Sequence, residues 1–147
     1  MEQLRKMEME LSTQGSAKSW EGMVRSSPFE VLPESQVQAA LGFAQAAFPR
    51  FREWRYCNQE DGQHDQFCLW GEYVHGEGYE APRFYVTFDR WEHQWGAHLT
   101  MGQHAFMWSS ADFGDAQVLQ TRGHAELDQA ILELKQKMAH LFSQLGA

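Results

Sequence analysis

At Phe51 the spacing of hydrophobic residues changes from three or four residues, which is typical of helices, to two, which is typical of strands. This change restricts the fold classes that the chain can adopt. Segments that alternate apolar and polar side chains follow from there. They are residues 51–57, 67–74, 83–89, 94–101 and 105–110. Turn-rich connections separate them, with Asp61-Gly62 inside the first. This order predicts an antiparallel β-meander of about five strands.

Helical periodicity flanks the alternating region on both sides. On the N-terminal side, Pro33 suits a first helical turn, and apolar residues recur at helical spacing until Pro49 ends the run. On the C-terminal side, the apolar stripe consists of Leu127, Ile131, Leu134, Met138, Leu141 and Leu145. We expect this stripe to pack on the sheet, although the same alternation of fours and threes also suits a helix–helix dimer.

The chain as a whole is expected to form one domain. Its 147 residues, 43% of them hydrophobic, are enough to build a core without metals or disulfides. Residues 1–16 combine a short amphipathic helix with a polar break, and one possibility is that this segment is loosely attached. We predict a single globular α+β domain over residues 1–147, in which N-terminal helices and a C-terminal amphipathic helix accompany the antiparallel meander.

The charge balance restricts the partners of the protein. Twelve basic and 20 acidic residues give a net charge of −8, which disfavours nucleic acids and anionic membranes because both attract basic surfaces. The sequence has no secretory signal and no run approaching the ~20 apolar residues that span a bilayer, so we expect a cytoplasmic protein. Cys57 and Cys68 are then expected to be free thiols, with a cross-strand disulfide as the alternative.

Short motifs do not assign a catalytic function. Residues 112–114 read Asp-Phe-Gly, which holds magnesium in protein kinases, but the other kinase motifs are missing. No nucleophile elbow, phosphate-binding loop or dinucleotide fingerprint is present. His93 and His104 are expected at opposite ends of one strand, too far apart to share an ion. The sequence therefore predicts no metal and no cofactor, and catalysis is not favoured.

The alternating strands predict two different sheet faces. The apolar face, expected under the C-terminal helix, carries Phe84, Val86, Phe88, Trp95, Ala97, Leu99 and Met101. The opposite face supplies the candidates for binding a ligand or partner, which are Trp54, Tyr56, Trp70, Tyr85, Thr87 and Thr100. On that face, Asp89 and His98 are the candidate acid and base of an enzyme, with Glu72 in support. If the remaining helices cover this face, these groups are structural instead.

These observations favour a small acidic module that binds another protein without catalysis. A hairpin-rich sheet with an acidic surface and amphipathic end helices resembles, in general build, small acidic bacterial adaptors such as secretion-type chaperones and immunity proteins. The resemblance implies a protein partner. A homodimer through the C-terminal helix is a further possibility. The alternative function is that of a small-ligand-binding protein or small enzyme that uses the aromatic–polar sheet face.

Overall fold

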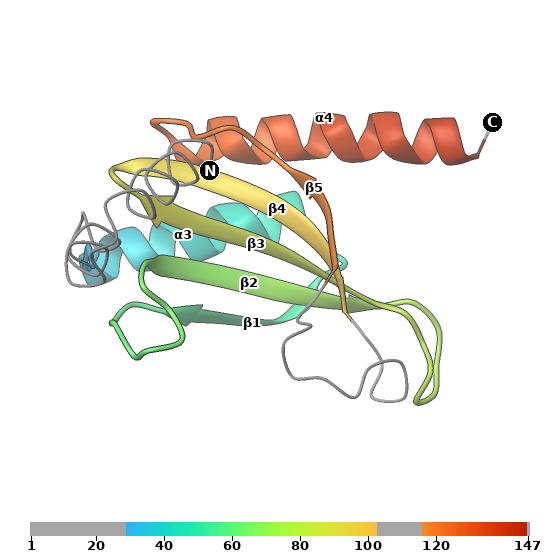
Figure 1. Cartoon of the computed structure of the whole chain (residues 1–147), viewed down its shortest axis with the longest axis horizontal. Coiled ribbons are helices and arrows are strands. Elements are labelled where there is room, and N and C mark those ends of the chain that lie inside the picture. Colours follow the sequence, from blue (N-terminus) through green and yellow to red (C-terminus); the bar gives the residue numbers. More distant parts are fainter. Residues whose placement is uncertain (1–28, 103–115, 147) are drawn as a thin grey trace, which may run out of the picture.

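The computed structural model describes residues 29–102 and 116–146, which form two helices and a five-stranded sheet (Figure 1). In chain order the elements are α3 (Glu34–Ala47), β1 (Arg52–Cys57), β2 (Phe67–Val74), β3 (Arg83–Trp91), β4 (Gln94–Gly102), β5 (Ala116–Gln120) and α4 (Leu127–Leu145). The strands follow one another across the sheet in sequence order, each antiparallel to the next. The predicted α+β class and antiparallel meander are confirmed.

Some sequence predictions fall outside the described residues. They concern the N-terminal helix within residues 1–16, the candidate strand at 105–110, His104 and the Asp-Phe-Gly tripeptide at 112–114. The fifth strand of the described sheet is Ala116–Gln120, which pairs with β4. The sequence pattern predicts no strand at that position.

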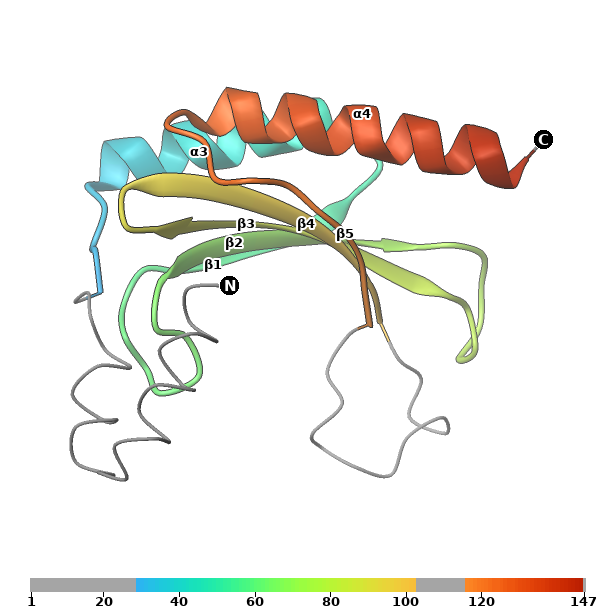
Figure 2. The same cartoon turned by 45° about the horizontal axis from the view of Figure 1, so that its top comes forward.

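Both helices lie on the same face of the sheet, above a single layer of strands (Figure 2). Their inward side chains meet those of the central strands in one core. Its largest fully buried side chains are Val37, Phe67, Leu69, Val86, Phe88, Leu99 and Leu134. The register pairs Val86 with Leu99 and Phe88 with Ala97, so the predicted apolar face of β3 and β4 is the helix-covered face. The predicted packing of the C-terminal helix on the sheet is therefore confirmed.

α3 lies between Pro33 and Pro49, although Pro33 is at the N-cap and not in the first helical turn predicted for it. The carbonyl of Pro33, at the N-cap, accepts hydrogen bonds from the backbone N–H groups of Gln36 and Val37. The helix ends at Ala47, ahead of Pro49, because proline disfavours a helical conformation in the residue before it. Of the two helices in the described part of the chain, neither has the length and apolarity needed to cross a bilayer.

α4 begins with a capping box. The side chains of Glu126 and Gln129 each accept a hydrogen bond from the other residue's backbone N–H, which satisfies two donors that the first turn leaves unpaired. The buried residues of the helix are Leu127, Ala130, Ile131 and Leu134. Towards its C-terminus, Phe142 and Leu145 are 49% and 72% exposed. Only the first half of the predicted stripe is therefore fully packed on the sheet.

A bulge interrupts the pairing of β1 with β2. Arg52 pairs with Glu72 and Arg55 with Trp70, so three steps along β1 correspond to two along β2. The extra residue is accommodated at Glu53, whose φ of 56° lies in the left-handed region. Because side chains alternate between faces, one inserted residue reverses the faces expected for the rest of the strand.

The bulge determines where the aromatic side chains of β1 lie. The ring of Tyr56 stacks on that of buried Phe67, with 28° between the ring planes. Trp54 packs against the core and lies over Gly71, where a side chain would collide with the indole. The structure therefore places Trp54 and Tyr56 on the helix-covered side of the sheet, which is opposite to the face predicted for them.

Candidate functional site

The sheet face opposite α3 and α4 gathers the other polar and aromatic candidates. We call it the open face, because neither of these two helices lies on it (Figure 2). Cross-strand register places the following side chains there: Cys68, Trp70, Glu72, Tyr85, Thr87, Asp89, His98 and Thr100. The open face therefore brings together all the candidates that the sequence analysis placed on β2, β3 and β4.

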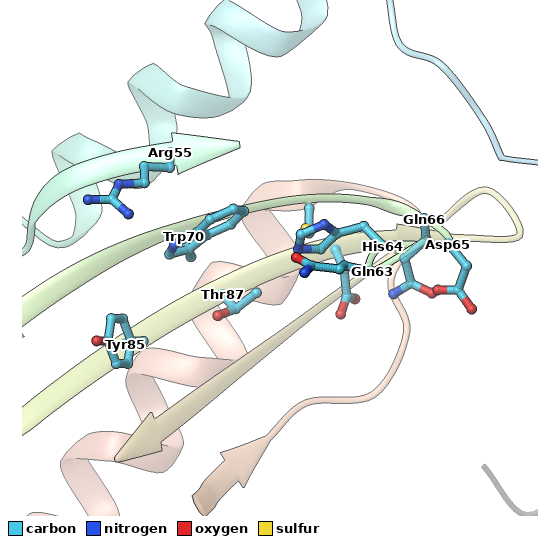
Figure 3. A pocket seen from close by; sticks show the side chains of 10 residues that line it. Arg55, Gln63, His64, Asp65, Gln66, Trp70, Tyr85 and Thr87 are labelled. Carbon is cyan, nitrogen blue, oxygen red and sulfur yellow. The ribbon is translucent and has the colours of Figure 1, made fainter. Parts of the chain in front are cut away.

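A pocket of about 530 Å³ is hollowed into the open face, between the strands and the connection from β1 to β2 (Figure 3). The strands contribute Arg55, Cys68, Trp70, Tyr85, Thr87 and Asp89, and the connection contributes residues 63–66. Small-ligand sites typically enclose ~300–1,000 Å³ and are mostly apolar. This pocket has such a size, but its lining is rich in charged and amide groups. It therefore suits a polar or charged ligand group.

The connection that borders the pocket is shaped by Asp61. Its Oδ1 accepts hydrogen bonds from the backbone N–H groups of Gln63 (3.0 Å) and His64 (2.8 Å), a pattern typical of Asp in turns. The bond from the His64 N–H is the main reason why the pKa of Asp61 is lowered. The imidazole of His64 in turn stacks on Trp70, with ring centroids 5.7 Å apart and 17° between the planes. The turn thus holds His64 against Trp70 at one end of the pocket.

Asp89 is the pocket residue whose acidity is most relevant to binding. Its side chain is 24% exposed, and burial raises its pKa from 3.8 to about 6, against the opposing effect of a hydrogen bond from Gln66. His98 Nδ1 lies 3.9 Å from the carboxylate, and burial lowers the pKa of this imidazole from 6.5. At pH 7 Asp89 is therefore mostly charged and His98 mostly neutral. A desolvated carboxylate of this kind gains from a cation or hydrogen-bond donor that a ligand brings.

Glu72 lies on the open face but outside the lining of the pocket. Its Oε2 accepts hydrogen bonds from Arg83 Nη1 and from the Tyr85 hydroxyl, each 3.0 Å long. The ring of Tyr85 also packs beside Gly102, where a side chain would collide with it. These contacts orient Tyr85 at the wall of the pocket. Thr100, which is 8% exposed, and His98 likewise lie on the open face without lining the pocket.

The pocket includes residues that the sequence analysis does not single out. Arg55 was not placed on this face by the sequence, because the bulge reverses the alternation of β1 and no sequence signal locates a bulge here. Residues 63–66 follow a recognisable turn signal, Asp61-Gly62, and Gly62 has a φ of 84° as such a turn requires. That signal predicts a turn, but it does not predict over which sheet face the turn folds.

No protein-family model matches the chain, and neither does any curated protein or solved structure with which it was compared. The architecture alone does not indicate a function, because one fold can host many unrelated activities. Function is therefore inferred from the chemistry of the pocket.

Proposed function

We propose that the protein is a non-catalytic binding module that docks another protein by receiving a positively charged side chain of that partner in its pocket. The observation that carries this proposal is the desolvated carboxylate of Asp89 in a pocket that Trp70 and Tyr85 also line. Burial raises the pKa of this carboxylate to about 6, so a positive charge brought next to it stabilises the ionised form. A lysine or arginine side chain supplies both the charge and the hydrogen-bond donors.

The aromatic residues of the pocket favour the same kind of ligand. A cation over the face of Trp or Tyr is attracted by the ring, with a contribution of about 0.5–2 kcal/mol. The aliphatic part of a lysine or arginine can pack on the same rings. Arg55 lies at another end of the pocket lining (Figure 3), and its guanidinium can donate hydrogen bonds to a partner's carbonyl oxygens. The net charge of −8 would also speed the approach of a basic partner.

A peptide-binding titration tests the proposal. The probes are short peptides with one central lysine or arginine in neutral surroundings, and the matched controls carry acetyl-lysine, which keeps the length but removes the charge. Binding is followed by the chemical shifts of the pocket residues. Asp89→Asn should weaken binding at least tenfold, and Trp70→Ala should weaken it by about 2 kcal/mol. The control variant Tyr56→Ala, which alters a 41% exposed aromatic on the other side of the sheet, should bind normally.

Two results of this titration would contradict the proposal. One is equal affinity for the lysine and acetyl-lysine peptides, because the charge would then be irrelevant. The other is unchanged affinity in Asp89→Asn, because the carboxylate would then play no part.

A second candidate function, that of a small-ligand-binding protein or small enzyme, is favoured by the proximity of Asp89 and His98. The 3.9 Å between carboxylate and imidazole, with one pKa raised and the other lowered, is suited to proton exchange with a bound molecule near neutral pH. Thermal melts with a metabolite library test this, since a ligand that binds only the folded state raises the melting temperature. A specific ligand whose effect is lost in His98→Gln and in Asp89→Asn would favour this function over peptide docking.

We also propose a cytoplasmic location and a homodimer through α4. The free thiols of Cys57 and Cys68 support a reducing compartment. Exposure of Phe142 and Leu145 at the end of α4 supports an apolar contact between two copies. Sedimentation analysis should show a dimer that Leu145→Glu converts to a monomer. A wild-type protein that is monomeric at all concentrations would contradict the dimer.

A further inference from the structure

A second cluster of reactive groups lies where β1 ends and the connection to β2 begins. The thiol of Cys57, the carboxylate of Asp61 and the imidazole of His64 converge there, with one ligand atom from each within 4.8 Å of the others. Asp61 Oδ2 lies 3.7 Å from Cys57 Sγ and 3.3 Å from His64 Nδ1. Within residues 29–102 and 116–146, these are the three side chains that lie close enough to share one metal ion.

The distances in this cluster are close to those of a tetrahedral zinc site. Zn–S bonds are about 2.3 Å long and Zn–N and Zn–O bonds about 2.0–2.1 Å, so tetrahedral angles separate sulfur and oxygen ligands by about 3.5 Å, and nitrogen and oxygen ligands by about 3.3 Å. In the cluster, the sulfur of Cys57 lies 3.7 Å from the Asp61 oxygen, and the nitrogen of His64 lies 3.3 Å from it. Two of the three separations thus match those of ligands that share one ion, and the third, between Cys57 and His64, lies within 4.8 Å.

Neighbouring groups hold two of the three ligands in place. Asp61 Oδ1 accepts hydrogen bonds from the backbone of Gln63 and His64, while Oδ2 lies on the side of Cys57. The imidazole of His64 is stacked on Trp70. Hydrogen bonds and packing of this kind orient the ligands of metal sites before the ion arrives, and they strengthen its binding.

We propose that Cys57, Asp61 and His64 together bind one divalent transition-metal ion, and that Zn²⁺ suits this mixed sulfur, nitrogen and oxygen set best. Magnesium and calcium ions are disfavoured because they prefer oxygen ligands alone. On binding, the Cys57 thiol loses its proton to solvent and the resulting thiolate bonds to the ion. Three protein ligands leave a fourth position for water or for a group entering the pocket, which His64 also lines. The proposed metal site is independent of whether the pocket binds a partner's side chain or a small molecule.

Cobalt and zinc titrations of the full chain, chelator-stripped and chemically reduced, test the site. A tetrahedral Co²⁺–thiolate bond produces a charge-transfer absorption that reports the sulfur ligand directly. We expect one Co²⁺ per chain with this absorption, displacement by Zn²⁺ and release of the thiol proton. Cys57→Ser should abolish the absorption, and Asp61→Asn and His64→Gln should each weaken Zn²⁺ binding about tenfold or more. Cys68→Ser is the matched control, because it removes the thiol directly opposite Cys57 across the strand pair and should keep the absorption.

Three outcomes would overturn the proposal. The first is a wild-type protein that takes up neither ion at micromolar concentrations. The second is uptake that Cys57→Ser leaves unchanged, since the ion would then be adventitious. The third is loss of the absorption in Cys68→Ser as well, which would rule out a set of three ligands with an open fourth position. Metal-free thermal melts identify a variant that does not fold. If Cys57→Ser does not fold, unchanged Zn²⁺ binding in Asp61→Asn and His64→Gln, at exposed and half-buried positions, would overturn the site.

Discussion

Replacing Asp89 by Asn should stabilise the protein at neutral pH, although the change removes a charged group from the candidate site. Burial raises the pKa of this carboxyl from 3.8 to about 6, so the folded state binds the proton more tightly than the unfolded state does. The contribution of Asp89 to stability is therefore most favourable at pH values below 3.8, the pKa of the carboxyl in the unfolded chain. This contribution is lost as the pH rises from about 4 to about 6. Above that range the full cost of the buried charge is present.

The size of this cost follows from the two pKa values. One pKa unit corresponds to about 1.4 kcal/mol, so the shift from 3.8 to about 6 corresponds to about 3 kcal/mol. Asn has nearly the shape of Asp and still accepts a hydrogen bond, but it carries no charge at any pH. The free energy of unfolding of Asp89→Asn should exceed that of the wild type by up to about 3 kcal/mol at pH 7.5, and the difference should fall to about 0.5 kcal/mol at pH 4.

Urea unfolding of both proteins at a series of pH values from 4 to 8 measures this difference directly. Glu80→Gln is the matched control, because Glu80 is an exposed carboxylate outside the pocket. It should change the free energy of unfolding by less than about 0.5 kcal/mol at every pH. If Asp89→Asn is less stable than the wild type at pH 7.5, or if the difference does not depend on pH, the reasoning is refuted. A charge kept at such a cost is expected where a protein trades stability for binding.

Three further predictions concern the core, the sheet and the thiols. Leu134→Ala, at a fully buried position, should lower the free energy of unfolding in urea by about 2–5 kcal/mol. The control Leu132→Ala, at a position 58% exposed on the same helix, should lower it by less than about 0.5 kcal/mol. Gly71→Ala should cost about 1–3 kcal/mol because the new Cβ would lie 2.6 Å from the overlying indole, and an unchanged unfolding midpoint would contradict the bulge in β1. In the metal-free protein, Cys57 and Cys68 should remain thiols, so dithiothreitol should not alter its melting temperature; an intact mass lower by two hydrogens would instead reveal a disulfide.

Local signals in the chain were sufficient for most of the fold. β2 spans Phe67 to Val74, the range that the alternation predicts. β3 and β4 are joined at Glu92 and His93, whose φ values of 51° and 66° are those of a tight hairpin turn. The apolar faces of these strands could be read directly, because successive side chains of any strand point to opposite faces. The same holds for α4, whose apolar stripe identified the side that packs on the sheet.

Contacts between segments remote in the sequence determined the features of the fold and the pocket that local signals did not predict. Trp54 and Tyr56 lie on the face opposite to the predicted one because of the bulge in β1, and Trp54 there occupies the space over Gly71 of the neighbouring strand. α3 and α4 share one face, and this arrangement leaves the pocket at Asp89 on the other (Figure 2). The pairing register and the side to which a connection folds are set by cross-strand and interlayer packing, which no local period encodes, so these features appear only in the folded chain.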